Sequence, residues 1–183
     1  MQALELLLNR RSQPRLVAPP PSSESLENIL QAGLSVPDHK CLQPWRFIVC
    51  TNDGLSKLGK IFEQAAMHKG SEQATLERAP LLPLRAPMVI VAICEYKEDE
   101  KVPKIEQVAS TACAVQAMQM AAIAQGFQGI WRTGWYAQNE EVKSSLKCKP
   151  EDEILGFLYL GSSPLSTMPR PAVVTNNFVE HWD

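Results

Sequence analysis

The sequence has few of the residues that mark disulfide-rich, metal-binding or membrane-spanning proteins. Its five cysteines are odd in number and scattered, and no two of them form a Cys-x-x-Cys pair. This argues against a disulfide framework or a zinc site and favours reduced thiols in a cytoplasmic protein. The histidines His39, His68 and His181 are too dispersed to suggest a metal cluster. The longest apolar run, 88–94, is far below the roughly 20 residues of a membrane span.

An excess of charge of one sign is also lacking. The net charge is −2 and the isoelectric point about 6.0, so the chain offers no broad electrostatic footprint for nucleic acid. Glu5 interrupts the N-terminal apolar run and the arginines follow that run, which is not the pattern of a signal peptide. Walker, Gly-x-Ser-x-Gly and His-Glu-x-x-His motifs are absent, which removes the usual support for ATP hydrolysis, serine hydrolysis and zinc proteolysis.

What is present is the composition of one globular domain, 1–183. The chain is 45% hydrophobic and 21% charged, and its 183 residues suffice for one sizeable core. Hydrophobic periodicity predicts helices and strands without the regular rhythm of a doubly wound sheet, which favours an α+β sandwich. The predicted helices cover about 2–9, 23–34, 55–69, 106–125 and 138–146, and the predicted strands 45–50, 88–94 and 154–160.

Local composition adds four expectations. Ser22 or Ser23 should cap the helix at 23–34. Residues 70–86 are polar and proline-dotted, which predicts a mobile excursion over the surface. Strand 88–94 is apolar on both faces and should lie at the centre of the sheet. The tail is β-prone at 172–175.

The predicted helix at 106–125 is rich in alanine and apolar nearly all round. Such a helix should be buried and should lie close to another helix, because small side chains allow close approach. In a chain of this length, burial on every side indicates that a partner subunit covers one face.

The stretch Arg10-Arg11-Ser12 has two interpretations. Cations at the end of a helix offset the helix dipole and commonly sit in water. Alternatively, the planar forks of two guanidinium groups can hold phosphate oxygens, and a serine hydroxyl adds a short hydrogen bond. The stretch alone does not decide between them.

The loop 37–45 combines His39, Lys40, Gln43 and Trp45 between two prolines. An amide that can bond ring donors and acceptors, beside aromatic stacking area, suits a planar heterocycle. The alternative is a proline-stiffened connector whose tryptophan packs in the core.

The segment 126–134 follows the alanine-rich helix, and its glycines Gly126 and Gly129 predict a turn. Gly126 is a candidate C-cap, and Gly129 would let a backbone N–H approach a ligand. Arg132 and Thr133 offer a second Arg/hydroxyl pair. The Gly-x-x-Gly spacing follows a helix rather than a strand, so it is not a Rossmann fingerprint.

A phosphorylated flat cofactor bound where two subunits meet would account for three features of the sequence. These are the two separated Arg/hydroxyl pairs, the loop suited to a heterocycle and the apolar helix that a partner subunit is expected to cover. With these residues the chain resembles the nitroreductase family of FMN-dependent oxidoreductases. The segments that carry the resemblance are 6–12, 37–40, 43–45, 101–103, 117–122, 124–127, 129–132 and 156–161.

The resemblance implies an intertwined homodimer with FMN at the subunit interface. Each chain would form a three-layer α+β sandwich with a central mixed or antiparallel sheet. Arg10, Arg11 and Ser12 would hold the FMN phosphate and ribityl chain from one subunit, and His39, with its loop through Gln43, would approach the flavin from the other. The site would be completed by Trp131, Arg132 and Thr133.

Ser35 departs from the family pattern, because close relatives carry at this position an arginine that contacts FMN. The loss could weaken flavin retention by about 1–3 kcal/mol unless Arg46 or Lys40 compensates. The tail after Gly161 also diverges. The nicotinamide site of the relatives falls on Ala121, Ala122, Ile123, Ala124, Gln125 and Gly126.

The activity implied is a ping-pong reduction of nitroaromatics, quinones or a related small acceptor by NAD(P)H, with the chemistry on the flavin and no side chain required as an acid or base. Two alternatives stay open. One is a flavin-binding carrier or sensor without turnover, and the other is a family member with a different flavin-dependent reduction.

Overall fold

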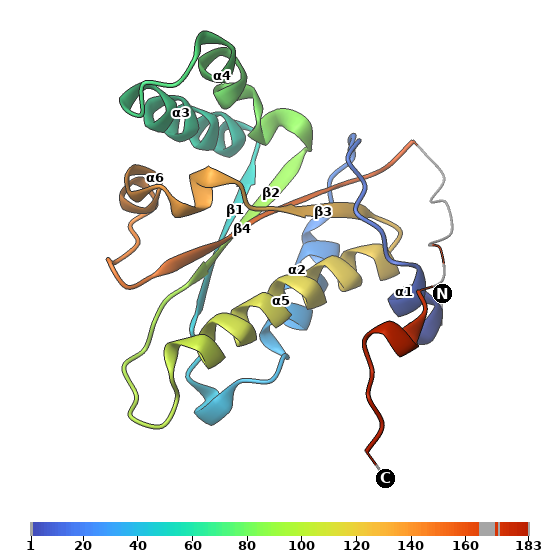
Figure 1. Ribbon diagram of the computed structural model, residues 1–183. Coiled ribbons are helices and arrows are strands. Elements are labelled where there is room, and N and C mark those ends of the chain that lie inside the picture. Colours follow the sequence, from blue (N-terminus) through green and yellow to red (C-terminus); the bar gives the residue numbers. More distant parts are fainter. Residues whose placement is uncertain (1, 165–170, 172, 183) are drawn as a thin grey trace.

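A four-stranded antiparallel sheet forms the centre of the protein (Figure 1). The computed structural model describes residues 2–164, 171 and 173–182. The strands are β1 (Trp45–Thr51), β2 (Met88–Cys94), β3 (Gln128–Arg132) and β4 (Glu153–Gly161), in the order β1-β2-β4-β3. All three neighbouring pairs run antiparallel, which decides between the mixed and antiparallel sheets expected from the sequence.

The central strands β2 and β4 are covered on both faces. Every residue of β2 is buried, as its unbroken apolar run predicts. Alternate side chains point to opposite faces of a strand, so Val89 and Val91 join one apolar cluster while Ile90 joins another. Helices pack against each cluster, and the chain therefore forms an α+β fold with the sheet between two helical layers (Figure 1).

Helices α2 (Ser23–Leu34) and α5 (Lys104–Ala124) form the layer on one face (Figure 1). Ile29 of α2 and Met118 of α5 are fully buried against β2 and β4. Gly33 lies so close to Met118 that an added Cβ would be 2.7 Å from its Cγ. The close approach of the alanine-rich helix to a second helix is therefore confirmed.

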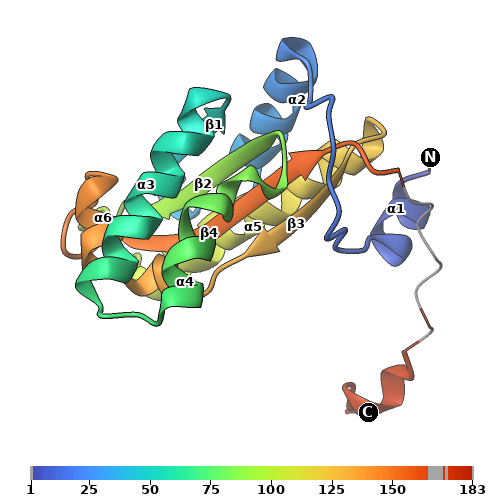
Figure 2. The same cartoon turned by 90° about the horizontal axis from the view of Figure 1, so that it is seen from above.

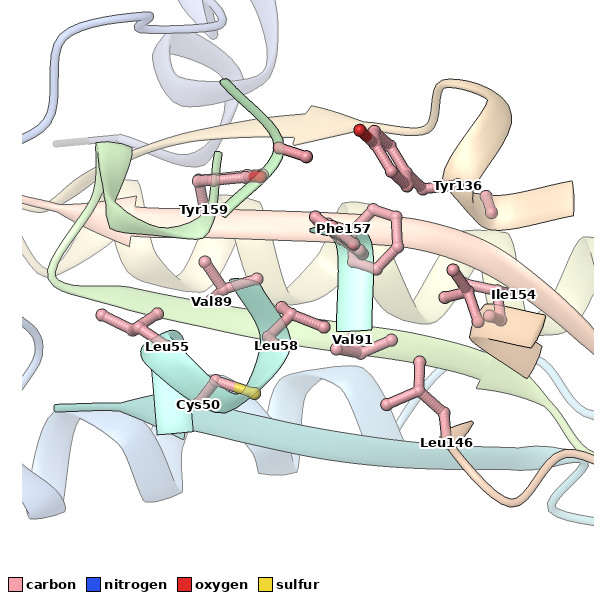
Figure 3. Close-up of a cluster of buried hydrophobic side chains, with 14 of the residues drawn as sticks. Cys50, Leu55, Leu58, Val89, Val91, Tyr136, Leu146, Ile154, Phe157 and Tyr159 are labelled. Atoms are coloured by element: carbon pink, nitrogen blue, oxygen red, sulfur yellow. The ribbon is translucent and has the colours of Figure 1, made fainter. Parts of the chain in front are cut away.

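The other face carries α3 (Asp53–His68), α4 (Gln73–Arg78), α6 (Glu140–Ser145) and the 3-10 turn η4 (Trp135–Gln138). Figure 3 shows the side chains of α3 meeting those of β2 and β4 in this layer. The ring of Phe62 stacks on Tyr136 at 4.4 Å between centroids and meets Phe157 edge-on at 5.0 Å. These rings join α3, η4 and β4 into one core.

The prediction of a mobile excursion at 70–86 is wrong. The segment contains α4 and the 3-10 turns η2 (Ala79–Leu81) and η3 (Pro83–Arg85), and Ala79 is fully buried. Gly59 of α3 approaches Pro80 so closely that an added Cβ would lie 2.4 Å from the Pro80 carbonyl oxygen. The prolines start short turns against α3 and do not lift the chain into solvent.

Strand β3 was not predicted, because the sequence around Gly129 was interpreted as a turn. Gly126 alone makes the turn: its N–H donates to Ile123 O and the Phe127 N–H to Ala122 O, both at 3.0 Å, which is a Schellman C-cap. Gly129 instead lies in the strand, where an added Cβ would be 2.9 Å from Leu160 Cδ2.

The two ends of the chain lie on the same side of the molecule (Figures 1 and 2). Helix α1 (Ala3–Asn9) contacts α5 there. In the predicted β-prone tail, Val173 and Val174 form no strand and Thr175 begins the 3-10 turn η5 (Thr175–Asn177), while Ala172 lies outside the described residues. Among the described residues, no helix has the length and hydropathy of a membrane span.

Smaller boundary differences follow from capping. Ser22 caps α2, since its hydroxyl oxygen accepts from the Ser25 N–H at 3.1 Å. The predicted helix 138–146 is shorter, because Asn139 caps it by accepting from the N–H groups of Glu141 and Val142, both at 3.1 Å. An asparagine cap of this kind begins a helix rather than lying within one.

Candidate functional site

The arginine pair lies directly after α1 and beside the edge strand β3. The Arg10 guanidinium donates to Ser12 Oγ at 3.4 Å. One residue later the Gln13 N–H donates to the Gly129 carbonyl at 3.0 Å, and Gln13 is buried. Arg10 and Arg11 are both partly buried. The structure thus ties the arginine stretch to the glycine-containing strand that the sequence separated from it by more than a hundred residues.

The second predicted pair lies at the far end of β3, where side chains alternate between the two faces of the sheet. Trp131 points to the α5 side, and its indole N–H donates to the Leu155 carbonyl at 2.9 Å. Arg132 points to the other side, with its guanidinium carbon 5.9 Å from the centre of the Tyr159 ring. Thr133 is exposed and precedes Gly134, whose φ of 70° turns the chain into η4.

The Nε of Arg132 is buried without a hydrogen-bond partner, and it is the one such side-chain nitrogen or oxygen among the described residues. Burial raises the pKa of Tyr159 to about 12, and the nearby charge of Arg132 opposes that rise. Tyr159 therefore stays neutral at physiological pH and does not neutralise the guanidinium. A buried donor of a cation without an acceptor is costly, so this position suits an anionic or oxygen-rich ligand.

The remaining predicted residues, Ser35, His39 and Gln43, lie together in the loop after α2. Ser35 ends that helix, and its hydroxyl donates to the Gln31 carbonyl at 2.6 Å. His39 Nδ1 is 2.8 Å from Glu106 Oε2, in the first turn of α5.

The arginine stretch and the His39 loop lie toward opposite ends of α5. This helix has 21 residues, a length of about 31 Å. Glu106, the partner of His39, is in its first turn, whereas α1, which precedes Arg10, lies against its later turns through Leu6 and Leu7. One chain therefore brings Arg10–Ser12 and Trp131–Thr133 to the same strand, but it holds the His39 loop at the end of α5 that lies away from Arg10.

The segment proposed from resemblance to bind a dinucleotide, 121–126, ends α5. Ala122 and Ile123 are buried. The Gln125 amide donates to the Ser25 carbonyl at 3.2 Å, and so ties α5 to the start of α2. With Gly126 in the C-cap, the contacts given for this segment are those of a helix terminus.

Arg46 and Lys40, the two cations considered as replacements for an arginine at Ser35, both have partners in this chain. Arg46 Nε donates to Glu95 Oε1 at 2.6 Å, and its Nη2 donates to the Leu146 and Lys147 carbonyls at 3.0 and 3.2 Å. Lys40 Nζ is 2.7 Å from Asp99 Oδ2.

The single chain leaves one face of α5 uncovered, and the partner subunit expected to cover that face stays a prediction. One face of α5 forms, with α1 and α2, an open groove of about 690 Å³. Its lining is almost wholly apolar, and Cys113 and Ala124 are exposed there. Leu4, Leu7 and Leu8 of α1 are each at least 60% exposed. Contiguous exposed apolar residues of this kind mark interaction surfaces.

Sequence reasoning missed Asp99 and Glu106, which hold the His39 loop through Lys40 and His39. Both carboxylates are remote in sequence from the loop and lie among other charged residues. No local signal distinguishes them. No group of three or more potential metal ligands exists among the described residues.

Comparisons with known proteins agree with this fold. The Escherichia coli K12 protein named "Putative NAD(P)H nitroreductase YdjA" is 47% identical over 165 residues, which cover 90% of each chain. A nitroreductase-like family protein from Bacillus cereus superposes with a TM-score of 0.87 at 19% identity, covering 100% of this chain and 97% of that one. A Desulfovibrio desulfuricans protein solved in complex with FMN gives a TM-score of 0.75 at 20% identity, covering 98% and 96%. The Nitroreductase family profile matches residues 7–162, and this chain belongs to the nitroreductase family.

Proposed function

We propose that the protein is an FMN-dependent oxidoreductase that uses NAD(P)H to reduce a small acceptor such as a nitroaromatic or a quinone. The observation that carries the proposal is the arrangement around β3. Arg10, Arg11 and Ser12 directly precede Gln13, whose N–H donates to Gly129 at the start of the strand. At the end of the strand, the Arg132 Nε is buried without a hydrogen-bond acceptor.

The residues fit FMN by the chemistry of their donors. Arg10 and Arg11 are suited to hold a phosphate, since guanidinium groups bind phosphate oxygens in bidentate fashion. Ser12 and Thr133 add hydroxyl groups for the ribityl chain, and Arg132 Nε adds a buried donor in need of an acceptor. When bound, FMN would supply hydride-accepting and hydride-donating chemistry at its ring.

The protein's part would be positional and electrostatic. Trp131 is fixed by its bond to Leu155 O and would present a rigid flank to the ring. Donors near the ring would favour the extra negative charge that reduction brings. No side chain of the site is needed as a general acid or base.

The site would be completed by a second copy of the chain. The His39 loop lies at the opposite end of α5 from Arg10, so His39 and Gln43 could join the arginines only from a partner. The apolar groove and the exposed leucines of α1 support a homodimer, because burial of this surface would be favourable.

The nicotinamide cofactor and the acceptor class are supported by the relatives. The name of the E. coli protein gives NAD(P)H and nitro reduction, and the D. desulfuricans structure contains FMN. At 47% identity, the former relationship makes a shared reaction type the simplest expectation.

An absorbance titration tests the cofactor. The purified protein should bind FMN and show a flavin spectrum, and Arg10→Ala with Arg11→Ala should weaken binding by at least about 100-fold, through the loss of two charge-assisted contacts. Lys57→Ala with Lys60→Ala, two exposed cations of α3, is the matched control and should leave binding unchanged. Normal FMN binding by the arginine variant would reject the phosphate role.

Turnover is tested separately. NADH or NADPH should bleach the bound flavin anaerobically, and a nitroaromatic or quinone should restore its colour. If both nucleotides fail to bleach a fully loaded protein, the chain is a flavin carrier or sensor. If bleaching is fast but neither acceptor restores the colour, the chain performs a different flavin-dependent reduction.

A further inference from the structure

The loop that carries His39 and Gln43 has an unusual backbone. Lys40, Cys41 and Gln43 have φ values of 62°, 53° and 50°. Non-glycine residues rarely adopt this left-handed region, and three within four positions carry an energetic cost. Such a conformation persists only where surrounding contacts hold it.

Helix α5 holds both ends of this loop. The hydroxyl of Ser110 donates to the Pro37 carbonyl at 2.7 Å, and the hydroxyl of Thr111 to the Pro44 carbonyl at 3.0 Å. Within the loop, the Gln43 N–H donates to Asp38 Oδ2 at 2.6 Å. These bonds fix the backbone but leave the side chains of His39 and Lys40 to be oriented by other groups.

Two carboxylates from the segment that precedes and begins α5 supply that orientation. Asp99 accepts from Lys40 Nζ at 2.7 and 3.0 Å and from the Lys101 N–H at 2.8 Å. Glu106 lies 2.8 Å from His39 Nδ1. A salt bridge and a histidine–carboxylate pair thus fasten consecutive residues of the loop.

We propose that Glu106 is a positioning residue for His39: it fixes the imidazole ring and its tautomer, so that Nε2 faces outward to accept a hydrogen bond from the FMN held by the partner copy. This inference rests on the proposed function, which brings His39 to that cofactor. It gives a role to Glu106, which is not among the residues proposed above to contact the flavin.

The chemistry of the pair determines the tautomer. A carboxylate has no proton to donate, so the hydrogen between Glu106 and His39 is carried by Nδ1. In the neutral ring Nε2 is then left as an acceptor. The ring is 53% exposed, so a partner molecule can reach Nε2 without unfolding the loop. Flavin N–H and ribityl O–H groups are donors of the kind that Nε2 would accept.

A second histidine–carboxylate pair provides a matched control. His68 Nδ1 of α3 lies 2.6 Å from Glu141 Oε1 of α6. Glu141, like Glu106, is in the first turn of its helix, so removing either carboxylate has a similar effect on the helix terminus. The His68 pair lies in the layer on the opposite face of the sheet from α5 (Figure 2).

The experiment is a titration of cofactor-stripped protein with FMN, followed by fluorescence quenching. His39→Ala should raise the dissociation constant about tenfold, and Glu106→Ala about three- to tenfold, in line with the loss of one hydrogen bond. Glu106→Gln retains a carbonyl acceptor and should restore most of the affinity. The double variant His39→Ala/Glu106→Ala should bind no more weakly than His39→Ala, since Glu106 acts through His39. Glu141→Ala should bind as the wild type.

Nitrogen NMR of the histidines gives a readout that a purely structural role would not move. In the cofactor-free wild type His39 should populate the Nδ1–H tautomer, and Glu106→Ala should shift it toward the Nε2–H form while the thermal midpoint changes no more than in Glu141→Ala. Wild-type affinity in Glu106→Ala, additive losses in the double variant, or an unchanged tautomer would each overturn the proposal. Unchanged affinity in His39→Ala would overturn it as well. In that case a continued requirement for Arg10 and Arg11 would show that the flavin site itself stands.

Discussion

Helix α5 has two faces of similar composition, of which one is buried and the other is open to solvent. One face, with Val115, Met118 and Ala122, is completely buried against α2 and the sheet. The other, with Cys113, Ala117 and Met120, lines an open groove beside α1. Both faces are apolar, so composition alone does not tell which one the chain covers itself. The difference shows that this fold completes its core on one side of α5 and leaves the other side open.

The same division applies to the candidate site. Residues on the strand side, Arg10 to Ser12 and Trp131 to Thr133, are brought together by one chain through the bond between Gln13 and Gly129. The His39 loop is fixed at the other end of the helix. Helix α5 therefore separates the arginine stretch from the His39 loop within one chain, and the proposal is that a second copy brings the two together.

The largest effect is expected on the buried face. Met118→Ala removes a side chain that is fully enclosed between α2 and the sheet, and should lower the free energy of unfolding by about 2–5 kcal/mol. Chemical denaturation followed by circular dichroism measures this. A loss below about 1 kcal/mol would mean that the contact between Gly33 and Met118 is looser than the structure indicates.

A charge in the groove should affect assembly instead of the fold. Ala117→Glu places a carboxylate on the open face, where it is solvated in a free chain but unpaired in a dimer, and should weaken dimerisation by several kcal/mol. Sedimentation at a series of concentrations measures the change. Ala74→Glu, at an exposed position of α4 on the opposite layer, is the control. Equal dimerisation of the two variants would contradict an interface at the groove.

Thiol alkylation distinguishes the open face of α5 from the buried sheet without unfolding the protein. Burial raises the pKa of Cys50 and of Cys94, so both should react slowly in any assembly state. Cys113 is exposed in the chain and lines the groove. It should be protected in the wild type and react several-fold faster in Ala117→Glu. Equal rates in the two proteins would place Cys113 outside the interface.

The smallest expected effect is a pH dependence of the free energy of unfolding. It arises within a single chain, from the pair Arg46–Glu95. Burial raises the pKa of Glu95, but the hydrogen bond and the charge of Arg46 lower it by more than burial raises it. The pKa is therefore depressed below its ordinary value of 4.5. The folded state therefore binds this proton less readily than the unfolded state. The pair stabilises the fold above pH 4.5, and that contribution is lost as the pH falls through the depressed pKa.

Acid titration of Arg46→Ala beside the wild type measures this contribution. The difference in unfolding free energy should shrink below pH 4.5 and should not depend on protein concentration. A dependence on concentration would assign the Arg46–Glu95 pair to the interface between copies.

Much of this architecture can be predicted from sequence periodicity. The run 88–94 is apolar at every position and becomes a fully buried central strand, and the alanine-rich helix packs closely on α2. The five residues of β3 were missed because Gly126 and Gly129 are equivalent in sequence, although one makes a left-handed cap and the other lies under Leu160. Only the tertiary contacts distinguish them.

The site divides in the same way. Arginine and hydroxyl pairs can be recognised by their chemistry, because it is local to a few adjacent residues. The roles of Glu106 and Asp99 depend on a loop folding back onto the start of α5 from about 60 residues away, a distance at which sequence carries no pairing signal. Likewise the open face of α5 cannot be told from its buried face until the sheet and α2 are placed.

Subunit complementation tests most directly whether the site is shared between two copies. Chains with Arg10→Ala/Arg11→Ala and chains with His39→Ala are co-expressed with different tags, the mixed dimer is purified, and its FMN binding is titrated against both parent dimers. In a shared site, the mixed dimer contains one site built from the intact arginines of one chain and the intact His39 loop of the other. We expect a class of sites with wild-type affinity, about one for every two chains, that neither parent shows. A mixed dimer without any such class would contradict the shared site and would place the whole FMN site within a single chain.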